Sequence, residues 1–132
     1  MGIVTRIRAA LIGEPEPLAR EVVERYPELH RLRLRRGGLP PRLGGWALGR
    51  ATVAAITLRR WVFLAPEVPA RPPLLLHELR HLEQFEANPL FPLHYLWASV
   101  RHGYHDNPFE ADARAFSARR LRTQGPSSAG DR

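Results

Sequence analysis

Cysteine is absent from the chain, and its absence excludes two kinds of structural support. Without thiols there is no disulfide framework, and no metal ion can be held by thiolate ligands. Any metal site must therefore be built from histidine and carboxylate side chains.

Long apolar runs are absent as well. No stretch approaches the roughly 18 apolar residues that a helix needs to cross a bilayer. The segment from Met1 to Gly13 is a poor secretory signal, because Arg6 and Arg8 interrupt its apolar residues. These absences predict a cytoplasmic protein with no transmembrane segment.

Lysine is also missing, so all 20 basic residues are arginine, and the formal net charge is +7. Arginine forks match the geometry of phosphate groups, and a basic surface is typical of nucleic-acid-binding proteins. The enrichment in Arg, Pro and Leu is equally expected of a GC-rich source, where it has no functional meaning. The second explanation is favoured, because charge alone speaks to solubility and non-specific association. Nucleic-acid binding is thereby disfavoured but not excluded.

The chain has 132 residues, of which 44% are apolar, and this is the size of one domain with one hydrophobic core. We therefore expect a single domain over residues 1–122. Residues 123–132 are small, polar and rich in Gly, Pro and Ser, so we expect a disordered tail there.

Local patterns of apolar and polar residues predict an α+β fold with a small antiparallel sheet. Alternating Leu and Arg residues indicate one strand, and two β-rich runs that meet at Arg59 and Arg60 indicate a hairpin. Apolar residues three or four positions apart, with prolines near the starts, indicate helices. The predicted strands cover His30–Arg36, Ala51–Leu58 and Trp61–Ala65. The predicted helices cover about Pro15–Tyr26, Leu74–Glu86, Leu90–His102 and Asn107–Arg122, and residues 37–45 form a predicted loop.

One predicted helix carries His77, Glu78 and His81 in the pattern His-Glu-x-x-His. Residues four apart on a helix lie one above the other, about 5 to 6 Å apart, so both imidazoles can bind one ion. Glu78 is one step round the helix, where it reaches a water on the ion rather than the ion itself. Leucines flank these three residues, which places them inside the protein. Burying their ionisable side chains without a partner such as a metal costs free energy. The alternative is coincidence, with both histidines hydrogen-bonded in an ordinary core.

A catalytic zinc site takes three protein ligands and leaves the fourth position to water, so another segment must supply the third ligand. A metzincin would have a histidine six residues past His81, where this chain has Ala87, and that class is excluded. The downstream candidates are His102, His105, Asp106, Glu110 and Asp112. Glu110 starts a helix that the single helix Leu90–His102 can bring back antiparallel to the motif. Its alternative role is a capping box with Asn107.

Further along, the chain carries Gly103-Tyr104 and then Asn107-Pro108-Phe109-Glu110-Ala111-Asp112-Ala113. With the hairpin and the first motif, this order resembles the bacterial zincin-like peptidase domains of the gluzincin group, over about Trp46–Ala118. It is most similar to the short domains of extracellular contractile-injection-system core proteins, and more distantly similar to the CAAX-type zinc peptidases. The resemblance implies that Glu110 is the third ligand and that Asp112 takes the second acidic place. Arg114 departs from the pattern, because relatives often carry there an acid that orients a histidine.

The resemblance implies a minimal zincin-like fold, with a small antiparallel sheet packed on the motif helix and a following antiparallel helix pair. It also implies a zinc-dependent peptidase, in which Zn²⁺ is held by His77, His81 and Glu110 and Glu78 is the general base. A peptide or protein substrate would add to the edge of the sheet, for which Trp61–Ala65 is expected. Candidate oxyanion donors are Tyr104, His102 and His105. A non-catalytic zinc-stabilised binding module and a basic nucleic-acid-binding protein are the other two functions considered.

Overall fold

Four short strands form one mixed sheet in the computed structural model, which describes residues 2–47 and 53–124. The spatial order is β1 (Glu14–Glu16), β2 (Arg33–Arg36), β4 (Trp61–Leu64) and β3 (Ala55–Leu58). β1 pairs antiparallel with β2, and β3 pairs antiparallel with β4, whereas β2 and β4 are parallel. The expectation of an antiparallel sheet is therefore wrong for this central pairing.

The predicted hairpin is confirmed, and its turn consists of Arg59 and Arg60. Arg59 has a φ of 58°, as the twist of a two-residue hairpin requires. The expected edge strand is wrong, because β4 lies between β2 and β3, and β3 forms the outer edge. Residues 51 and 52 of the predicted strand lie outside the described residues.

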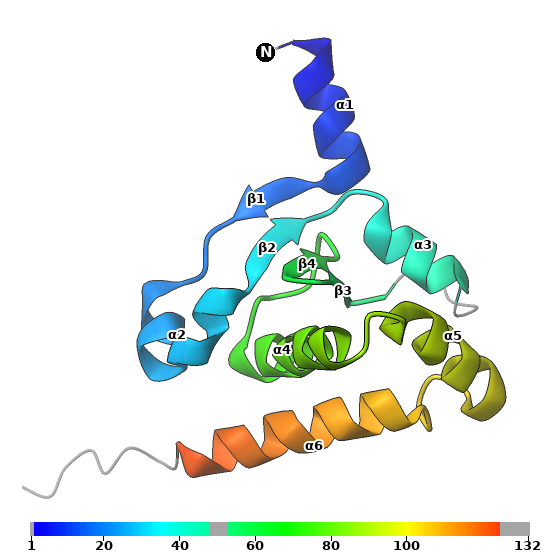
Figure 1. Ribbon diagram of the computed structural model, residues 1–132. Coiled ribbons are helices and arrows are strands. Elements are labelled where there is room, and N and C mark those ends of the chain that lie inside the picture. Colours follow the sequence, from blue (N-terminus) through cyan, green and yellow to red (C-terminus); the bar gives the residue numbers. More distant parts are fainter. Residues whose placement is uncertain (1, 48–52, 125–132) are drawn as a thin grey trace, which may run out of the picture.

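Helices surround the sheet, and together with it they form the predicted α+β fold (Figure 1). In the described residues they are α1 (Ile3–Ile12), α2 (Arg20–Arg25), the 3-10 helix η1 (Pro27–Arg31), α3 (Pro40–Ala47), α4 (Pro72–Ala87), α5 (Phe91–His102) and α6 (Pro108–Thr123). The three helices predicted after the hairpin are confirmed to within a few residues. No described helix has both the length and the apolar composition to cross a membrane.

The amino-terminal third departs from the sequence prediction in three places. The helix expected over Pro15–Tyr26 is reduced to α2, because Glu14–Glu16 pairs with β2 as a strand. α3 lies in the predicted loop, where two prolines occupy the first turn and need no hydrogen-bonded N–H. α1 was not predicted at all. At the other end, Thr123 belongs to α6, and residues 125–132 of the predicted tail lie outside the described residues.

Two glycines fix the junction between α1, β1 and the sheet. Gly13 and Gly38 have φ values of 69° and 80°, in the left-handed region that favours glycine. A Cβ atom at Gly13 would lie 2.2 Å from the carbonyl oxygen of Arg36, and one at Gly38 would lie 2.5 Å from the nitrogen of Gly13. The buried Arg35 guanidinium donates to the carbonyl oxygens of Ile12 and Gly13 at the same place.

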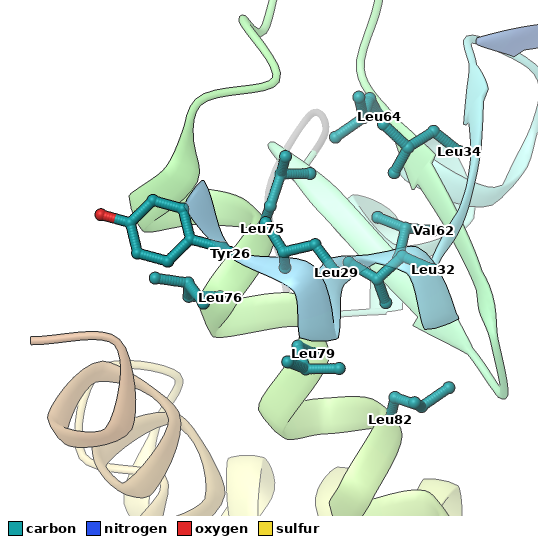
Figure 2. Close-up of a cluster of buried hydrophobic side chains, with 10 residues drawn as sticks. All are labelled: Tyr26, Leu29, Leu32, Leu34, Val62, Leu64, Leu75, Leu76, Leu79 and Leu82. Atoms are coloured by element: carbon teal, nitrogen blue, oxygen red, sulfur yellow. The ribbon is translucent and has the colours of Figure 1, made fainter. Parts of the chain in front are cut away.

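The hydrophobic core lies between α4 and the sheet, with η1 closing one side (Figure 2). It consists of Tyr26, Leu29, Leu32, Leu34, Val62, Leu64, Leu75, Leu76, Leu79 and Leu82. Burial of each large apolar side chain contributes about 1.5 to 3 kcal/mol, so the four leucines of α4 fix the rotation of this helix about its axis. At 100° per residue, His77 and His81 then lie on the opposite side of α4.

α6 runs back along α4 in the opposite direction, and α5 makes the turn between them (Figure 1). Near the start of α6, Glu110 contacts His81. Seven residues later, the Ser117 hydroxyl donates to the carbonyl oxygen of Pro73, near the start of α4. The antiparallel return predicted for the last helix is therefore confirmed.

Candidate metal centre

His77 and His81 lie one turn apart on the side of α4 that faces away from the core. Their Nε2 atoms are 3.2 Å apart, and their ring centroids are 4.8 Å apart. His81 is buried and His77 is half-buried. The four-residue spacing thus brings two nitrogen donors to one point, as the sequence predicts.

Glu110, in the first turn of α6, brings a carboxylate to the same point. Its Oε2 atom lies 2.8 Å from Nε2 of His77, and its Oε1 atom lies 3.0 Å from Nε2 of His81. The Tyr95 hydroxyl of α5 donates to Oε1 at 2.7 Å. Only 3% of Glu110 is exposed, so α4, α5 and α6 together enclose this carboxylate.

Glu110 does not take the capping role that the sequence left open. The Asn107 side chain caps α6 by accepting from the backbone N–H of Phe109 at 2.9 Å. In a capping box the Glu110 carboxylate would bind the backbone N–H of Asn107, but that N–H donates to the carbonyl oxygen of Tyr104. The Glu110 carboxylate instead contacts the two histidines.

Burial and the interactions within this cluster have opposite effects on the pKa values of His81 and Glu110. Burial lowers the pKa of His81, but the hydrogen bond with Glu110 and the charges of Glu78 and Glu110 outweigh it and raise the pKa to about 9. Burial raises the pKa of Glu110, but hydrogen bonds from His77 and His81 outweigh it and hold the pKa well below its usual range. Burial and the charge of Glu110 raise the pKa of Tyr95, which stays a hydrogen-bond donor. The buried carboxylate therefore favours a positive charge at this point.

The three side chains fit a tetrahedral zinc ion. Zinc bonds of about 2.0 to 2.1 Å at tetrahedral angles separate neighbouring donor atoms by roughly 3.3 Å. The donor atoms of His77, His81 and Glu110 are 2.8 to 3.2 Å apart, so small outward shifts would accommodate the ion. His77, Glu78 and His81 also offer ligand atoms within 4.8 Å of one another, which makes Glu78 a rival third ligand.

Glu78 is oriented by the edge of the sheet. The Thr57 hydroxyl of β3 donates to Oε2 of Glu78 at 2.6 Å, and both side chains are buried. This bond directs one carboxylate oxygen toward β3, whereas the Glu110 carboxylate bonds both histidines. Glu78 is therefore better suited to accept a proton beside the donor cluster than to complete it.

Gln84 determines which nitrogen of a neutral His81 ring carries the proton. The Gln84 amide donates to the carbonyl oxygen of Phe109 at 3.0 Å and to Oδ2 of Asp112 at 2.9 Å, which orients its NH₂ group. Its Oε1 atom therefore faces Nδ1 of His81, at 2.8 Å. An amide oxygen can only accept, so Nδ1 must be the donor. The Nε2 atom of a neutral His81 then presents its lone pair to the donor cluster, as a zinc ligand requires.

The remaining acidic and histidine candidates lie outside the donor cluster. Asp112 accepts from Arg80 at 2.7 Å and from Gln84, so it supports the cluster from behind. Arg114, the departure from the family pattern, is exposed and donates to the carbonyl oxygen of His105. The other downstream candidates are exposed side chains at the end of α5 and in the loop after it: His102, His105 and Asp106.

A cavity of about 290 Å³ opens beside the cluster. Its walls are mostly apolar and come largely from α3, β3 and α5, and its polar lining includes Glu78, His81 and Glu110. Glu78 and Tyr104 also line a second hollow together with His77. Of the three candidate oxyanion donors, Tyr104 alone is among the residues that line these two hollows.

Three residues of this site were not predicted from the sequence: Thr57, Gln84 and Tyr95. Gln84 had a readable signal, because it lies three residues after His81 and so on the same face of α4. Tyr95 and Thr57 had none, because their contacts span 15 and 21 residues and depend on how α5 and β3 pack.

Comparison with protein-family models, curated proteins and solved structures finds no match for this chain. The resemblance to zincin-like peptidases therefore rests on the two sequence motifs. The arrangement of the site must carry the functional argument.

Proposed function

We propose that this chain is a zinc-dependent metallopeptidase of the zincin-like kind, with His77, His81 and Glu110 as zinc ligands. The observation that carries the proposal is the convergence of two imidazoles and one buried carboxylate within 3.2 Å. Histidines kept only for core packing would not need this carboxylate, whose burial costs free energy unless a cation faces it. Zinc, when bound, would supply a Lewis acid and a water of lowered pKa.

Glu78 would act as the general base, taking the proton from water and passing it to the leaving amine. Because Thr57 binds Oε2 of Glu78, Oε1 is the oxygen left for this transfer. Burial keeps bulk water from competing for the carboxylate, since Glu78 is 4% exposed. The hydrogen bond to β3 thus links the base to the strand that would hold the substrate.

The proposed substrate is an extended peptide that adds alongside β3. β3 is an edge strand, and all four of its residues line the cavity beside the donor cluster. An extended chain can pair with such an edge through its backbone, while its side chains enter neighbouring pockets. The apolar walls of the cavity favour a large apolar side chain next to the scissile bond.

Tyr104 is the proposed donor to the oxyanion. It lines both hollows together with Glu78. A substrate carbonyl group bound between Tyr104 and Glu78 would therefore be close to both the phenol and the base. A phenol O–H is a donor that can stabilise developing negative charge in this way. His102 and His105 are exposed and are not assigned this role.

The test is zinc content followed by peptide hydrolysis, with Glu78→Gln as the critical variant. Purified without an affinity metal and given zinc, the wild-type chain should retain one equivalent after desalting and cleave a peptide library at apolar residues. Gln keeps the size of Glu78 but cannot act as a base, so turnover should fall about 100-fold or more while zinc stays bound. Elemental analysis and mass spectrometry of the products measure the two quantities separately.

The alternatives give different outcomes in the same experiment. A non-catalytic zinc-stabilised module would retain zinc and show no cleavage in the wild type or in Glu78→Gln. Loss of zinc from Glu78→Gln would make Glu78 the third ligand. A wild-type chain with well under one equivalent of zinc would remove the metallopeptidase assignment and leave the nucleic-acid-binding function as the next to test.

A further inference from the structure

α5 is apolar on two sides, and only one of them packs against the protein. Phe91 and Ala98 are buried, and the ring of Phe91 lies 6.0 Å from that of His81. The outer side exposes large apolar residues at helical spacing, with Trp97 66% and Val100 81% exposed. We call this surface the outer face of α5, and it consists of the N-cap residue Leu90 and of Leu93, Leu96, Trp97 and Val100 in the helix.

An exposed apolar residue of α3 extends the outer face of α5 at the mouth of the cavity. Leu96 of α5 and Leu43 of α3 both line the cavity, and both are exposed. α3 and α5 lie on the same side of the molecule, at the right of Figure 1. Monomeric proteins rarely expose a contiguous apolar surface of this kind unless something binds to it.

The charged residues on α3 and α5 themselves are arginines. Residues 38–66 and 87–105, which include α3, β3, β4 and α5, contain no Asp or Glu. The exposed Arg42 follows the start of α3, and the exposed Arg101 lies four residues after Trp97 on the same face of α5. The nearest acids along the chain, Glu86 and Asp106, lie just beyond the two ends of α5.

We propose that the outer face of α5, with the adjoining end of α3, docks on an anionic lipid surface. A helix that lies in a membrane interface combines Trp and Leu side chains with basic residues, and Trp prefers the headgroup level. A second copy of the chain is a poor occupant, because each copy would bring the same cations, Arg42 and Arg101, on two helices that carry no acid to neutralise them. Anionic headgroups supply the missing negative charge.

Docking by this face would bring the cavity mouth next to the membrane. The consequence for the substrate rests on the proposed function: cleaved peptides would be extended segments held at the lipid surface. The docking itself depends on neither zinc nor catalysis. Glu78→Gln should therefore bind lipid as the wild type does, whether or not the wild type is a peptidase.

Vesicle sedimentation of the full purified chain, with and without added zinc, tests the proposal. We expect binding to vesicles of phosphatidylglycerol and phosphatidylcholine at a 3:7 ratio, weaker binding at higher salt, and little binding to pure phosphatidylcholine. The double variant Leu93→Gln with Trp97→Gln should weaken binding at least tenfold. Both side chains are exposed, so the variant should fold, and circular dichroism checks this.

The matched control is Ile3→Gln with Val4→Gln on α1, which removes two apolar residues that are at least as exposed and lie far from α5 (Figure 1). It should bind within threefold of the wild type. The proposal is overturned if the wild type does not bind anionic vesicles, binds pure phosphatidylcholine equally well, or loses as much binding in the control as in the α5 variant. Wild-type dimers that the α5 variant dissociates, without vesicle binding, would assign the face to a second copy.

Discussion

Three of the side chains proposed for the chemistry have a neighbour outside the donor cluster that limits how they can point. Gln84 binds Nδ1 of His81, Tyr95 binds Oε1 of Glu110, and Thr57 binds Oε2 of Glu78. Such supporting hydrogen bonds keep a catalytic group near its working geometry and remove alternative rotamers. The Gln84 amide oxygen fixes the orientation of the His81 ring through Nδ1.

The identity of the third ligand can be tested by comparing Glu110→Gln with Asp112→Asn. Glu110→Gln replaces a carboxylate next to both histidines with a neutral amide, so we expect zinc affinity to fall at least tenfold. Asp112→Asn changes a residue that contacts Arg80 and Gln84 but neither histidine, so the loss should be smaller. Chelator competition measures both affinities.

The stability of the same two variants is the control, since a general loss of folding would also release zinc. Both variants should unfold cooperatively, as followed by circular dichroism. Equal affinities for wild type and Glu110→Gln, or a loss confined to Asp112→Asn, would move the third ligand away from Glu110.

The extent to which the site was readable from sequence depends on how far apart its residues lie along the chain. His77 and His81 are on one helix, so their spacing alone predicts that their donor atoms meet. Glu110 reaches the histidines only if two further helices have the right length and direction. Its identity as the third ligand therefore came from the motif resemblance and not from spacing. Thr57 could not be inferred, because its contact with Glu78 depends on which strand lies at the sheet edge.

At the scale of elements, β3 connects the proposed peptide site to the proposed base through Thr57. Thr57→Val keeps the shape of the side chain but removes the hydroxyl that binds Glu78. We expect turnover to fall roughly tenfold, on the scale of losing one hydrogen bond to a charged group, with zinc content unchanged. Thr57→Ser keeps the hydroxyl and should restore most of the activity.

The measurement separates positioning from simple stabilisation. If Thr57 only stabilised the sheet, Thr57→Val would lower the melting temperature and leave kcat of the folded enzyme unchanged. A positioning role predicts instead a fall in kcat of the folded enzyme, which Thr57→Ser should largely reverse because it keeps the hydroxyl that binds Glu78. Equal kcat values for wild type and Thr57→Val would contradict it.

The elements themselves were predictable where the pattern was local. The prolines and leucines of α4 and the Asn107-Pro108 start of α6 gave both helices to within two residues. The sheet order was not readable, because the parallel β2–β4 pair joins segments 28 residues apart in register. The apolar spacing of α5 predicted a helix. It did not show that this helix is apolar on two sides, or that one of these sides is exposed.

At the scale of the whole molecule, several of the many arginines form hydrogen bonds and ion pairs within the fold. Arg35 and Arg36 donate to backbone carbonyl groups, and Arg36 also pairs with Glu16. Arg80 pairs with Asp112, and Arg120 pairs with Glu28. These guanidinium groups are engaged within the protein, which supports a compositional origin for the bias over a dedicated phosphate-binding surface. The exposed arginines beside α3 and α5 are those that the lipid-docking proposal uses.

The buried pair of His81 and Glu110 also sets how the stability of the zinc-free chain depends on pH. The pKa of His81 is raised from 6.5 to about 9, so its stabilising contribution is complete below about pH 6.5 and is lost as the pH rises through 9. The pKa of Glu110 is lowered from 4.5, so its contribution is present above that pH and is lost in stronger acid. The zinc-free chain should therefore be most stable between about pH 4.5 and 6.5.

Zinc should reverse this dependence at the alkaline end, because the ion must displace the proton from His81. With a His81 pKa of about 9, proton competition at pH 6 should weaken zinc binding by roughly two to three orders of magnitude relative to pH 9. The gain in melting temperature on adding one equivalent of zinc should then be small at pH 6 and largest near pH 9. Thermal unfolding of chelator-treated protein, with and without zinc at pH 6, 7.5 and 9, measures this gain. His81→Ala should abolish it at every pH, and a wild-type gain that is larger at pH 6 than at pH 9 would show that zinc does not replace the His81 proton.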